Sequence, residues 1–333
     1  MMEFPAPDMI LVNGITLGVY RMGPEPHETD KPPVIFIHGF PELAYSWRYQ
    51  MTALSQAGYP VFAPDMRGYG VSDKPEGVAA YTMGELTKDL AGIVAHYGLG
   101  KAVFVGHDWG ALALWSLPFY QRDMLLGLTG LNVAFMPNYT MDPIEMFRRA
   151  FGDDMYMVRF QEEGVCDAIL NADPAKTIRF FMRRAKKSSS KMGDVKKLPR
   201  RPNLDLVNML EEGDESAWFG ENWLSDEDMK VYSDAFAAGG FTGPINWYRN
   251  FTSNWEKMKE FQPEGSEPSI DVPCLMVTAD LDAACPARLA DGMENYIKNY
   301  RRLDLTGISH WSQQEAYEEI NEALLSWLKD NWG

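Results

Sequence analysis

The chain has 333 residues, of which 46% are hydrophobic and 13% aromatic, and its formal net charge is -16 at pH 7. This composition predicts a folded globular protein, and the negative charge disfavours nucleic acid and anionic membrane surfaces as partners. The sequence contains neither a secretion signal nor an apolar run of membrane-spanning length. Its three cysteines have no disulfide or metal-site spacing, so we expect a reducing cytoplasm as the compartment.

The first part of the chain alternates between strand and helix patterns. Asn13-Gly14 separates two apolar stretches within residues 9–20, which is typical of a β-hairpin. Further strands are expected at residues 32–39, 60–65, 101–108 and 125–134, and helices at 44–58, 83–98 and 110–120. Because the strands are apolar on both faces, the sequence predicts an α/β fold with a mostly parallel sheet and helices on both of its faces.

The alternation of strand and helix patterns stops at residue 136 and resumes only in the last third of the chain. The intervening segment is helical, aromatic and charged, and its basic run at 183–197 reads as a solvated helix end and loop. We expect strands at 273–280 and 301–307 and helices at 287–300 and 313–332. The domains expected are therefore a core of residues 1–135 and 245–333, and an inserted helical cap, or lid, at 136–244.

A nucleophile elbow is predicted at Gly106-His107-Asp108-Trp109-Gly110, between an apolar strand and a helix. In such a turn the two glycines relieve crowding, so that the middle side chain projects into a cleft. Here that side chain is the carboxylate of Asp108 instead of a serine hydroxyl. A Gly-bounded turn in which Asp108 only caps the next helix is the alternative.

An acid and a base should follow the nucleophile in chain order, each after a strand of the core. Of the five histidines, only His310 occupies that place, directly after the last expected strand. The orienting acid is Asp282 or Asp280, and Asp282 is favoured because it lies in the loop beyond the strand. Asn132, at the other position used in related folds, is neutral and would not stabilise an imidazolium in the same way.

Three further groups of residues follow from these positions. The backbone N–H groups of Phe40, in the stretch HGFPE (38–42), and of Trp109 are expected to form an oxyanion hole. His38 and His107 are interpreted as packed or hydrogen-bonded supports. All three cysteines are interpreted as packing residues, because none lies beside a candidate base in the sequence.

The motifs together resemble those of the soluble epoxide hydrolases of the α/β-hydrolase superfamily, over nearly all of residues 30–330. The matching stretches are HGFPE, DMRGYGVSD, GHDWG, RFQEEG, GGFTGPINWYRN, VTADLD and GISHW. The resemblance implies the α/β-hydrolase fold in a short form without a phosphatase domain. It also places the two cap tyrosines of that family on Tyr156 and Tyr248.

The activity implied is hydrolysis of an epoxide to a vicinal diol, through an ester on Asp108 that water activated by His310 then cleaves. The substrates are water and a small apolar or aromatic epoxide, with Phe40, Trp109 and Trp247 as pocket walls. No metal or organic cofactor is expected, and the protein is expected to be a monomer or homodimer. The alternatives are a haloalkane or haloacid dehalogenase with the same nucleophile, an esterase, and a hydrolase-fold protein that binds a ligand without turnover.

Overall fold

A computed structural model describes residues 4–137, 140–185, 204–263, 266 and 268–333 of the chain. Its strands are β1 (Asp8–Val12), β2 (Ile15–Met22), β3 (Val34–Ile37), β4 (Val61–Pro64), β5 (Ala102–His107), β6 (Leu125–Leu131), β7 (Cys274–Ala279) and β8 (Tyr300–Leu305). Its helices are α1 (Arg48–Gln56), α2 (Met83–His96), α3 (Trp109–Tyr120), α4 (Pro143–Phe151), α5 (Tyr156–Arg159), α6 (Val165–Ala172), α7 (Pro174–Phe181), α8 (Leu206–Glu212), α9 (Asp226–Gly239), α10 (Thr242–Arg249), α11 (Phe251–Phe261), α12 (Ser312–Glu315) and α13 (Tyr317–Trp332). Short 3₁₀ turns lie between several of these elements.

The eight strands form one sheet in the order β1-β2-β4-β3-β5-β6-β7-β8. Strands β1 and β2 form the predicted antiparallel hairpin, in which Asn13 and Gly14 both have positive φ. Strand β2 also pairs antiparallel with β4, and every later pairing from β4 to β8 is parallel. The mostly parallel sheet predicted from the apolar strands is therefore confirmed.

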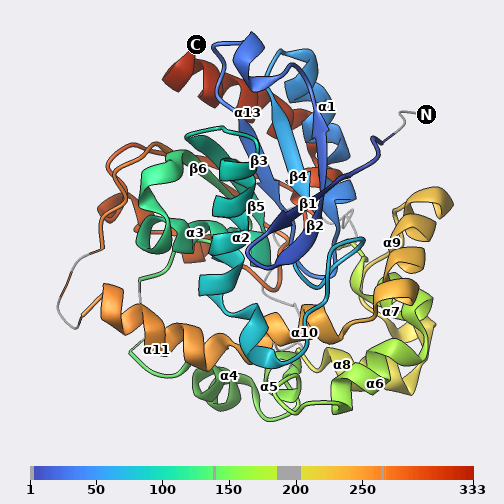
Figure 1. Ribbon diagram of the computed structural model, residues 1–333. Helices are drawn as coiled ribbons and strands as arrows, with labels where there is room; N and C mark the ends of the chain where they lie inside the picture. Colours follow the sequence, from blue (N-terminus) through green and yellow to red (C-terminus); the bar gives the residue numbers. More distant parts are fainter. Residues whose placement is uncertain (1–3, 138–139, 186–203, 264–265, 267) are drawn as a thin grey trace.

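Helices cover both faces of the sheet. Successive residues of each central strand point to opposite faces, so the apolar side chains of one strand pack against both helix layers. In β3, Ile35 and Ile37 belong to the core cluster on the face of α2 and α3. Val34 and Phe36 belong to the cluster on the opposite face, with α1 and α13. Figure 1 shows these two helix layers on either side of the central strands.

Helices α4 to α11 all lie between β6 and β7 in the chain. In Figure 1 they gather below the sheet, beyond the ends of its central strands. The expected boundary at residue 244 falls inside α10, and the next strand begins at Cys274. Of the basic run at 183–197, all but the first three residues lie outside the described part of the chain.

The prediction of a helix at residues 287–300 is wrong. The structure has only two 3₁₀ turns there, η7 (Ala287–Ala290) and η8 (Met293–Asn295), followed by the start of β8. Gly292, which lies between the turns, has a φ of 90°, a conformation that no α-helical residue adopts. The predicted C-terminal helix is likewise divided at Ala316 into α12 and α13.

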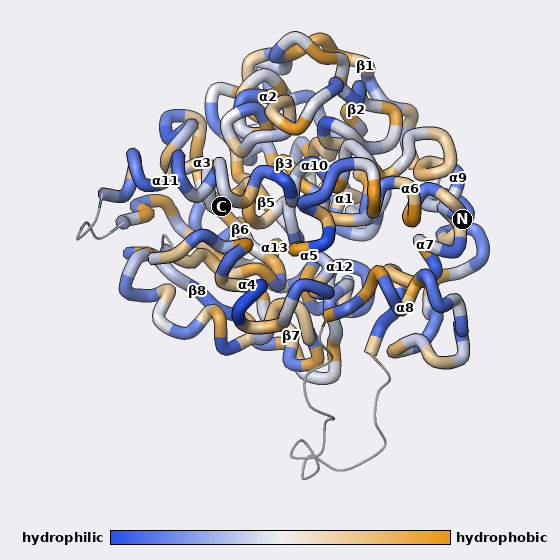
Figure 2. Tube along the Cα trace, turned by 90° about the horizontal axis from the view of Figure 1, so that it is seen from below, coloured by the Kyte–Doolittle hydropathy of each residue, from blue (hydrophilic) through white to orange (hydrophobic). Residues whose placement is uncertain are grey.

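The polar residues of the chain lie mainly on its outer elements. Figure 2 shows hydrophilic stretches on the edge strand β8 and on the outer helix α9. Among the residues that the structure describes, no helix has both the length and the apolar character needed to cross a membrane.

Candidate active site

The turn between β5 and α3 holds Asp108 in a strained backbone conformation, with φ 51° and ψ -122°. The flanking glycines are required by close packing. A Cβ on Gly106 would collide with the carbonyl group of Gly110, and a Cβ on Gly110 would collide with the carbonyl group of Ile37. The sequence therefore forms the sharp strand-to-helix turn that presents the Asp108 side chain at the carboxyl edge of the sheet.

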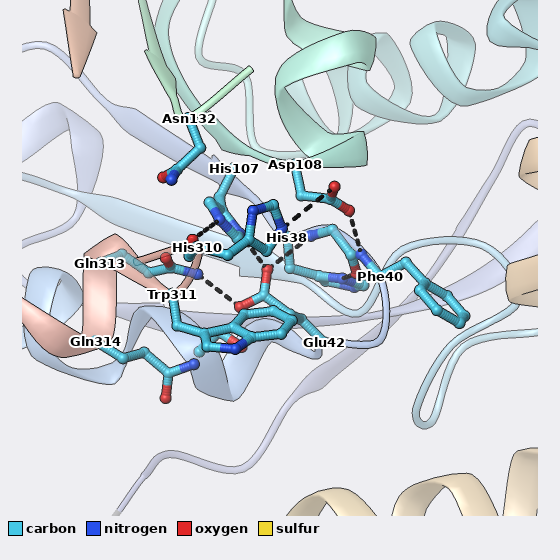
Figure 3. A network of polar contacts seen from close by, with 12 residues as sticks. His38, Phe40, Glu42, His107, Asp108, Asn132, His310, Trp311, Gln313 and Gln314 are labelled. Carbon is cyan, nitrogen blue, oxygen red and sulfur yellow. Dashed lines mark hydrogen bonds and ion pairs between the residues drawn. The ribbon is translucent and has the colours of Figure 1, made fainter. Parts of the chain in front are cut away.

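His310 lies between two carboxylates. Its Nδ1 is 2.8 Å from Asp282 Oδ2, and its Nε2 is 3.5 Å from Asp108 Oδ2. Asp282 follows β7 and His310 follows β8, so neighbouring parallel strands bring the two residues to the same edge of the sheet. The structure thus brings together the nucleophile, acid and base predicted from their order in the chain. Figure 3 shows Asp108 and His310 of this group.

The charges in this group alter the protonation of its members. Burial lowers the pKa of His310, but the charge of Asp282 and hydrogen bonds to Asp108 and Asp282 outweigh burial and raise it well above the usual value of 6.5. Burial raises the pKa of Asp282, but the charge and hydrogen bond of His310 outweigh it and lower that pKa to about 2. Asp282 is therefore an ionised partner for the imidazole ring.

The neighbouring candidates Asp280 and Asn132 make other contacts. Asp280 accepts a hydrogen bond from the Gly307 backbone N–H at 2.7 Å, and His310 contacts Asp282 instead. Asn132 follows β6 and donates its side-chain amide to Asp282 Oδ2 at 2.8 Å. An amide at this position therefore helps to fix the carboxylate that faces the base.

The second oxygen of Asp108 faces the loop after β3. Phe40 donates its backbone N–H to Asp108 Oδ1 at 2.8 Å. Trp109 is the first residue of α3, where backbone N–H groups have no partner within the helix. The expected oxyanion donors thus lie on the two segments that flank the Asp108 carboxylate.

Tyr156 at the start of α5 and Tyr248 in α10 lie over Asp108. Their ring centroids are 5.9 Å apart. The Trp109 ring packs edge-to-face against the Tyr248 ring, with 4.9 Å between the centroids. Burial, together with the charge of Asp108, raises the pKa of both tyrosines well above 10, so both hydroxyls keep their protons.

Aromatic side chains surround the Tyr248 ring. Phe40 packs edge-to-face on Tyr248 at 5.3 Å between centroids, and Trp109 contacts both Tyr248 and Trp247. Trp247 is fully buried and donates its indole N–H to the Arg67 carbonyl at 3.2 Å. Phe40 and Trp109 therefore pack directly against the Tyr248 ring, whereas Trp247 contacts Trp109.

Glu42 and His107 form a buried network under the site (Figure 3). His107 Nδ1 lies 2.6 Å from Glu42 Oε2, and His107 Nε2 lies 2.7 Å from the backbone carbonyl oxygen of His310. Gly39 and Gln313 donate to the two oxygens of Glu42. Burial raises the pKa of Glu42, but its contacts with His107 outweigh burial and lower it.

Cys285 packs against the hydrophobic core, as interpreted from the sequence, but it also lies beside the predicted base. Cys285 has its thiol beside Asp282 and His310, with one ligand atom of each residue within 4.8 Å of the others. The loop after β7 turns back on itself, because Ala284 and Cys285 both donate their backbone N–H groups to Asp282 Oδ1 at 2.9 Å. Burial and the charges of Asp282 and Asp108 raise the pKa of the thiol.

Glu42 and Gln313 were not predicted from the sequence as parts of the site. Glu42 belongs to the stretch HGFPE, and a carboxylate in an otherwise apolar loop after a buried strand was a usable signal. Gln313 gives no such signal, because a polar residue near a helix start is ordinary. His38, by contrast, is a hydrogen-bonded residue that accepts the Met66 backbone N–H at 2.9 Å.

Three comparisons place the chain among known proteins. A sequence family described as "alpha/beta hydrolase fold" matches residues 32–317. The chain is 37% identical to Epoxide hydrolase A of Mycobacterium tuberculosis, over 98% of each chain. It is 33% identical to Bifunctional epoxide hydrolase 2 of Sus scrofa over 96% of its own length, and it spans 54% of that relative. The crystal structure of Epoxide Hydrolase A from Mycobacterium thermoresistibile is 36% identical, covers 98% of both chains and has a TM-score of 0.81.

Proposed function

Because the chain belongs to the epoxide hydrolases of the α/β-hydrolase fold family, we propose that it converts an epoxide and water to a vicinal diol through an ester on Asp108. The fold class and the family resemblance expected from the sequence are confirmed by the same comparisons. The observation that carries the proposed mechanism is a carboxylate at the elbow, with one oxygen on a backbone N–H and the other facing a histidine.

In the first step, Asp108 Oδ2 attacks the less hindered carbon of the epoxide ring. The ring C–O bond breaks, its electron pair moves to the ring oxygen, and Tyr156 or Tyr248 supplies the proton while the other hydroxyl donates a hydrogen bond. A serine at this position would form an ether, which water does not readily cleave. A carboxylate forms an ester, and an ester can be hydrolysed in a second step.

In the second step, His310 takes a proton from water, and the hydroxide adds to the carbonyl carbon of the Asp108 ester. The Phe40 and Trp109 N–H groups hold the resulting oxyanion. Its collapse breaks the acyl C–O bond, and the departing alkoxide takes a proton from His310 to give the diol. The new carboxylic acid of Asp108 returns a proton to the deprotonated tyrosine. Ester formation removes the charge of Asp108, which is one cause of the raised pKa of His310. His310 therefore becomes a free base when the hydrolytic step needs one.

The proposal also covers the substrate, the cofactor requirement and the domain organisation. The aromatic surround of Tyr248 supports an apolar or aromatic epoxide as substrate. Side chains of the protein supply every proton transfer and displacement above, so we propose that no metal or organic cofactor takes part. Residues 136–244 are proposed as the cap, since Tyr156 of α5 contributes to the site from this segment.

We further propose that the protein works in the cytoplasm as a monomer or homodimer. The free state of Cys166, Cys274 and Cys285 supports a reducing compartment. A dehalogenase is disfavoured, because Phe40 offers no side-chain donor for a departing halide beside Trp109.

The proposed roles of Asp108 as nucleophile and His310 as base are tested with the variant His310→Gln and styrene oxide as the substrate. This variant should form the Asp108 ester and fail to hydrolyse it, so intact-protein mass spectrometry should detect one adduct per chain. The control is His96→Gln, which changes an exposed histidine on α2 and should turn over without adduct. A folded His310→Gln protein that makes neither adduct nor diol would contradict the proposal.

A further inference from the structure

The loop that follows β7 places a thiol in the proposed active site. Asp282 Oδ1 is held by the Ala284 and Cys285 backbone N–H groups, which leaves Asp282 Oδ2 directed at His310 Nδ1. Cys285 is a free cysteine and is partly exposed, in contrast to the buried Cys166 and Cys274. The proposed reaction uses the imidazole and the carboxylate of this cluster but not the thiol.

We propose that Cys285, His310 and Asp282 form a binding site for a thiophilic divalent cation, Zn²⁺ or Cd²⁺, and that the bound cation reversibly inhibits the enzyme. A thiolate, an imidazole and a carboxylate oxygen form a ligand set suited to zinc, and the sulfur favours these cations over Mg²⁺ and Ca²⁺. The inhibitory consequence rests on the proposed role of His310 as the base.

The spacing of the cluster is close to that of a metal site. One ligand atom from each of the three side chains lies within 4.8 Å of the others. Metal–ligand bonds of about 2.0–2.3 Å in tetrahedral geometry put neighbouring ligand atoms about 3.5 Å apart. Rotation of the Cys285 side chain about its Cα–Cβ bond would change the distance of its sulfur from the other two ligand atoms and would leave the backbone N–H bond to Asp282 intact.

The charge of the site favours a cation. Asp282 and Asp108 both lie against the His310 ring, with carboxylate oxygens 2.8 and 3.5 Å from its two nitrogens. A dication bound there would exchange the thiol proton of Cys285 for a metal–sulfur bond and release that proton to solvent. With one thiolate and one carboxylate as ligands, the two positive charges are neutralised within the site.

Binding would block the second step of the proposed reaction. A cation on His310 Nδ1, the nitrogen that faces Asp282, would leave the ring proton on Nε2, the nitrogen that faces Asp108. Nε2 could then no longer take a proton from water, and His310 would no longer be held by Asp282 in the same position. Inhibition should therefore be complete at saturation and should be reversed by a chelator such as EDTA.

The test compares the wild type with Cys285→Ser and with Cys166→Ala, which removes a buried thiol on α6. After treatment with EDTA, diol formation from styrene oxide is measured against added Cd²⁺ or Zn²⁺, with Mg²⁺ as the hard-cation control. Loss of a ligand should raise the half-inhibitory Cd²⁺ concentration at least about 10- to 100-fold in Cys285→Ser. Cys166→Ala should be as sensitive as the wild type.

A second readout does not depend on turnover. Cd²⁺ should produce a thiolate-to-metal absorption band in the ultraviolet, with one equivalent per chain, in the wild type and in Cys166→Ala but not in Cys285→Ser. The metal site is overturned if the wild type shows no such band, or if Cys285→Ser is inhibited as strongly as the wild type. A Cys285-dependent band in a protein that makes no diol would leave the metal site standing and would contradict the proposed function instead.

Discussion

The two oxygens of Asp108 have different neighbours, and this difference assigns them different tasks in the proposed mechanism. Oδ1 is held by the Phe40 backbone N–H at 2.8 Å, whereas Oδ2 has only the longer contact of 3.5 Å with His310. Oδ2 is therefore the freer oxygen for attack on a ring carbon. Oδ1 already has the donor that would stabilise it as an oxyanion in the second step.

The cap tyrosines give a prediction at the residue scale. Tyr156→Phe or Tyr248→Phe removes one donor to the ring oxygen, and we expect each to slow ester formation by about 100- to 1000-fold. The double variant should lose nearly all ring opening. Rapid-mixing measurement of ester formation in the His310→Gln background isolates this step. Unchanged ester formation in the double variant would exclude the tyrosines as proton donors.

At the residue scale, the sequence predicts those site residues whose chemical roles fix their order along the chain. Asp108, Asp282 and His310 were predicted from the elbow and from positions after core strands, but Tyr156 and Tyr248 were placed only by family resemblance. The position of Cys285 beside His310 was not predicted, because only the pairing of β7 with β8 brings the two residues together.

At the scale of elements, Glu42 contacts three segments that lie at the ends of different strands. It accepts the Gly39 N–H in the loop after β3, contacts His107 at the end of β5, and accepts the Gln313 side-chain amide in α12. His107 in turn lies 2.7 Å from the His310 carbonyl oxygen. This network sets the relative positions of the oxyanion loop, the elbow and the base.

Glu42→Gln tests the contribution of this network. The substitution removes a buried charge that accepts hydrogen bonds from Gly39 and Gln313 and places an amide N–H against these donors, so we expect a loss of about 1–3 kcal/mol in unfolding free energy. Hydrolysis of the Asp108 ester should also slow, because the His310 backbone loses its support. Urea unfolding and single-turnover kinetics measure both effects, with the exposed Glu318→Gln as control. Wild-type stability in Glu42→Gln would show that the network has no such role.

The elements themselves were predictable to different degrees. The hairpin at Asn13-Gly14 and the apolar central strands follow from local residue choice, because turn chemistry and burial on both faces leave few alternatives. The segment at 287–300 resembles a helix in its spacing of apolar residues, yet Gly292 and contacts with the end of the sheet give two short 3₁₀ turns. Tertiary packing, and not local helix propensity, determines the conformation of this segment.

At the scale of the whole molecule, pH links the site to stability. The pKa of Asp282 in the folded protein is about 2, below its usual value of 3.8, so its stabilisation is present above pH 3.8 and is lost as pH falls through about 2. The folded pKa of His310 is raised above 6.5, so its stabilisation is present below that value and is lost as pH rises through the folded pKa.

The pair should therefore stabilise the protein most between about pH 4 and pH 6.5. We expect the wild type to exceed His310→Gln in unfolding free energy by about 2 kcal/mol in this range, and by less at alkaline pH. Urea unfolding across the pH range measures the difference, and His96→Gln should show no such trend. A difference that grows with pH would have the wrong sign for this ion pair.

The central claim is that an Asp108 oxygen enters the product, and one turnover in heavy-oxygen water tests it most directly. With enzyme in excess over styrene oxide, the first diol should contain only ordinary oxygen, and the protein should gain one heavy oxygen atom, located by peptide mass spectrometry at Asp108. A first diol that carries heavy oxygen, with the protein mass unchanged, would mean that water opens the ring directly and would contradict the ester mechanism.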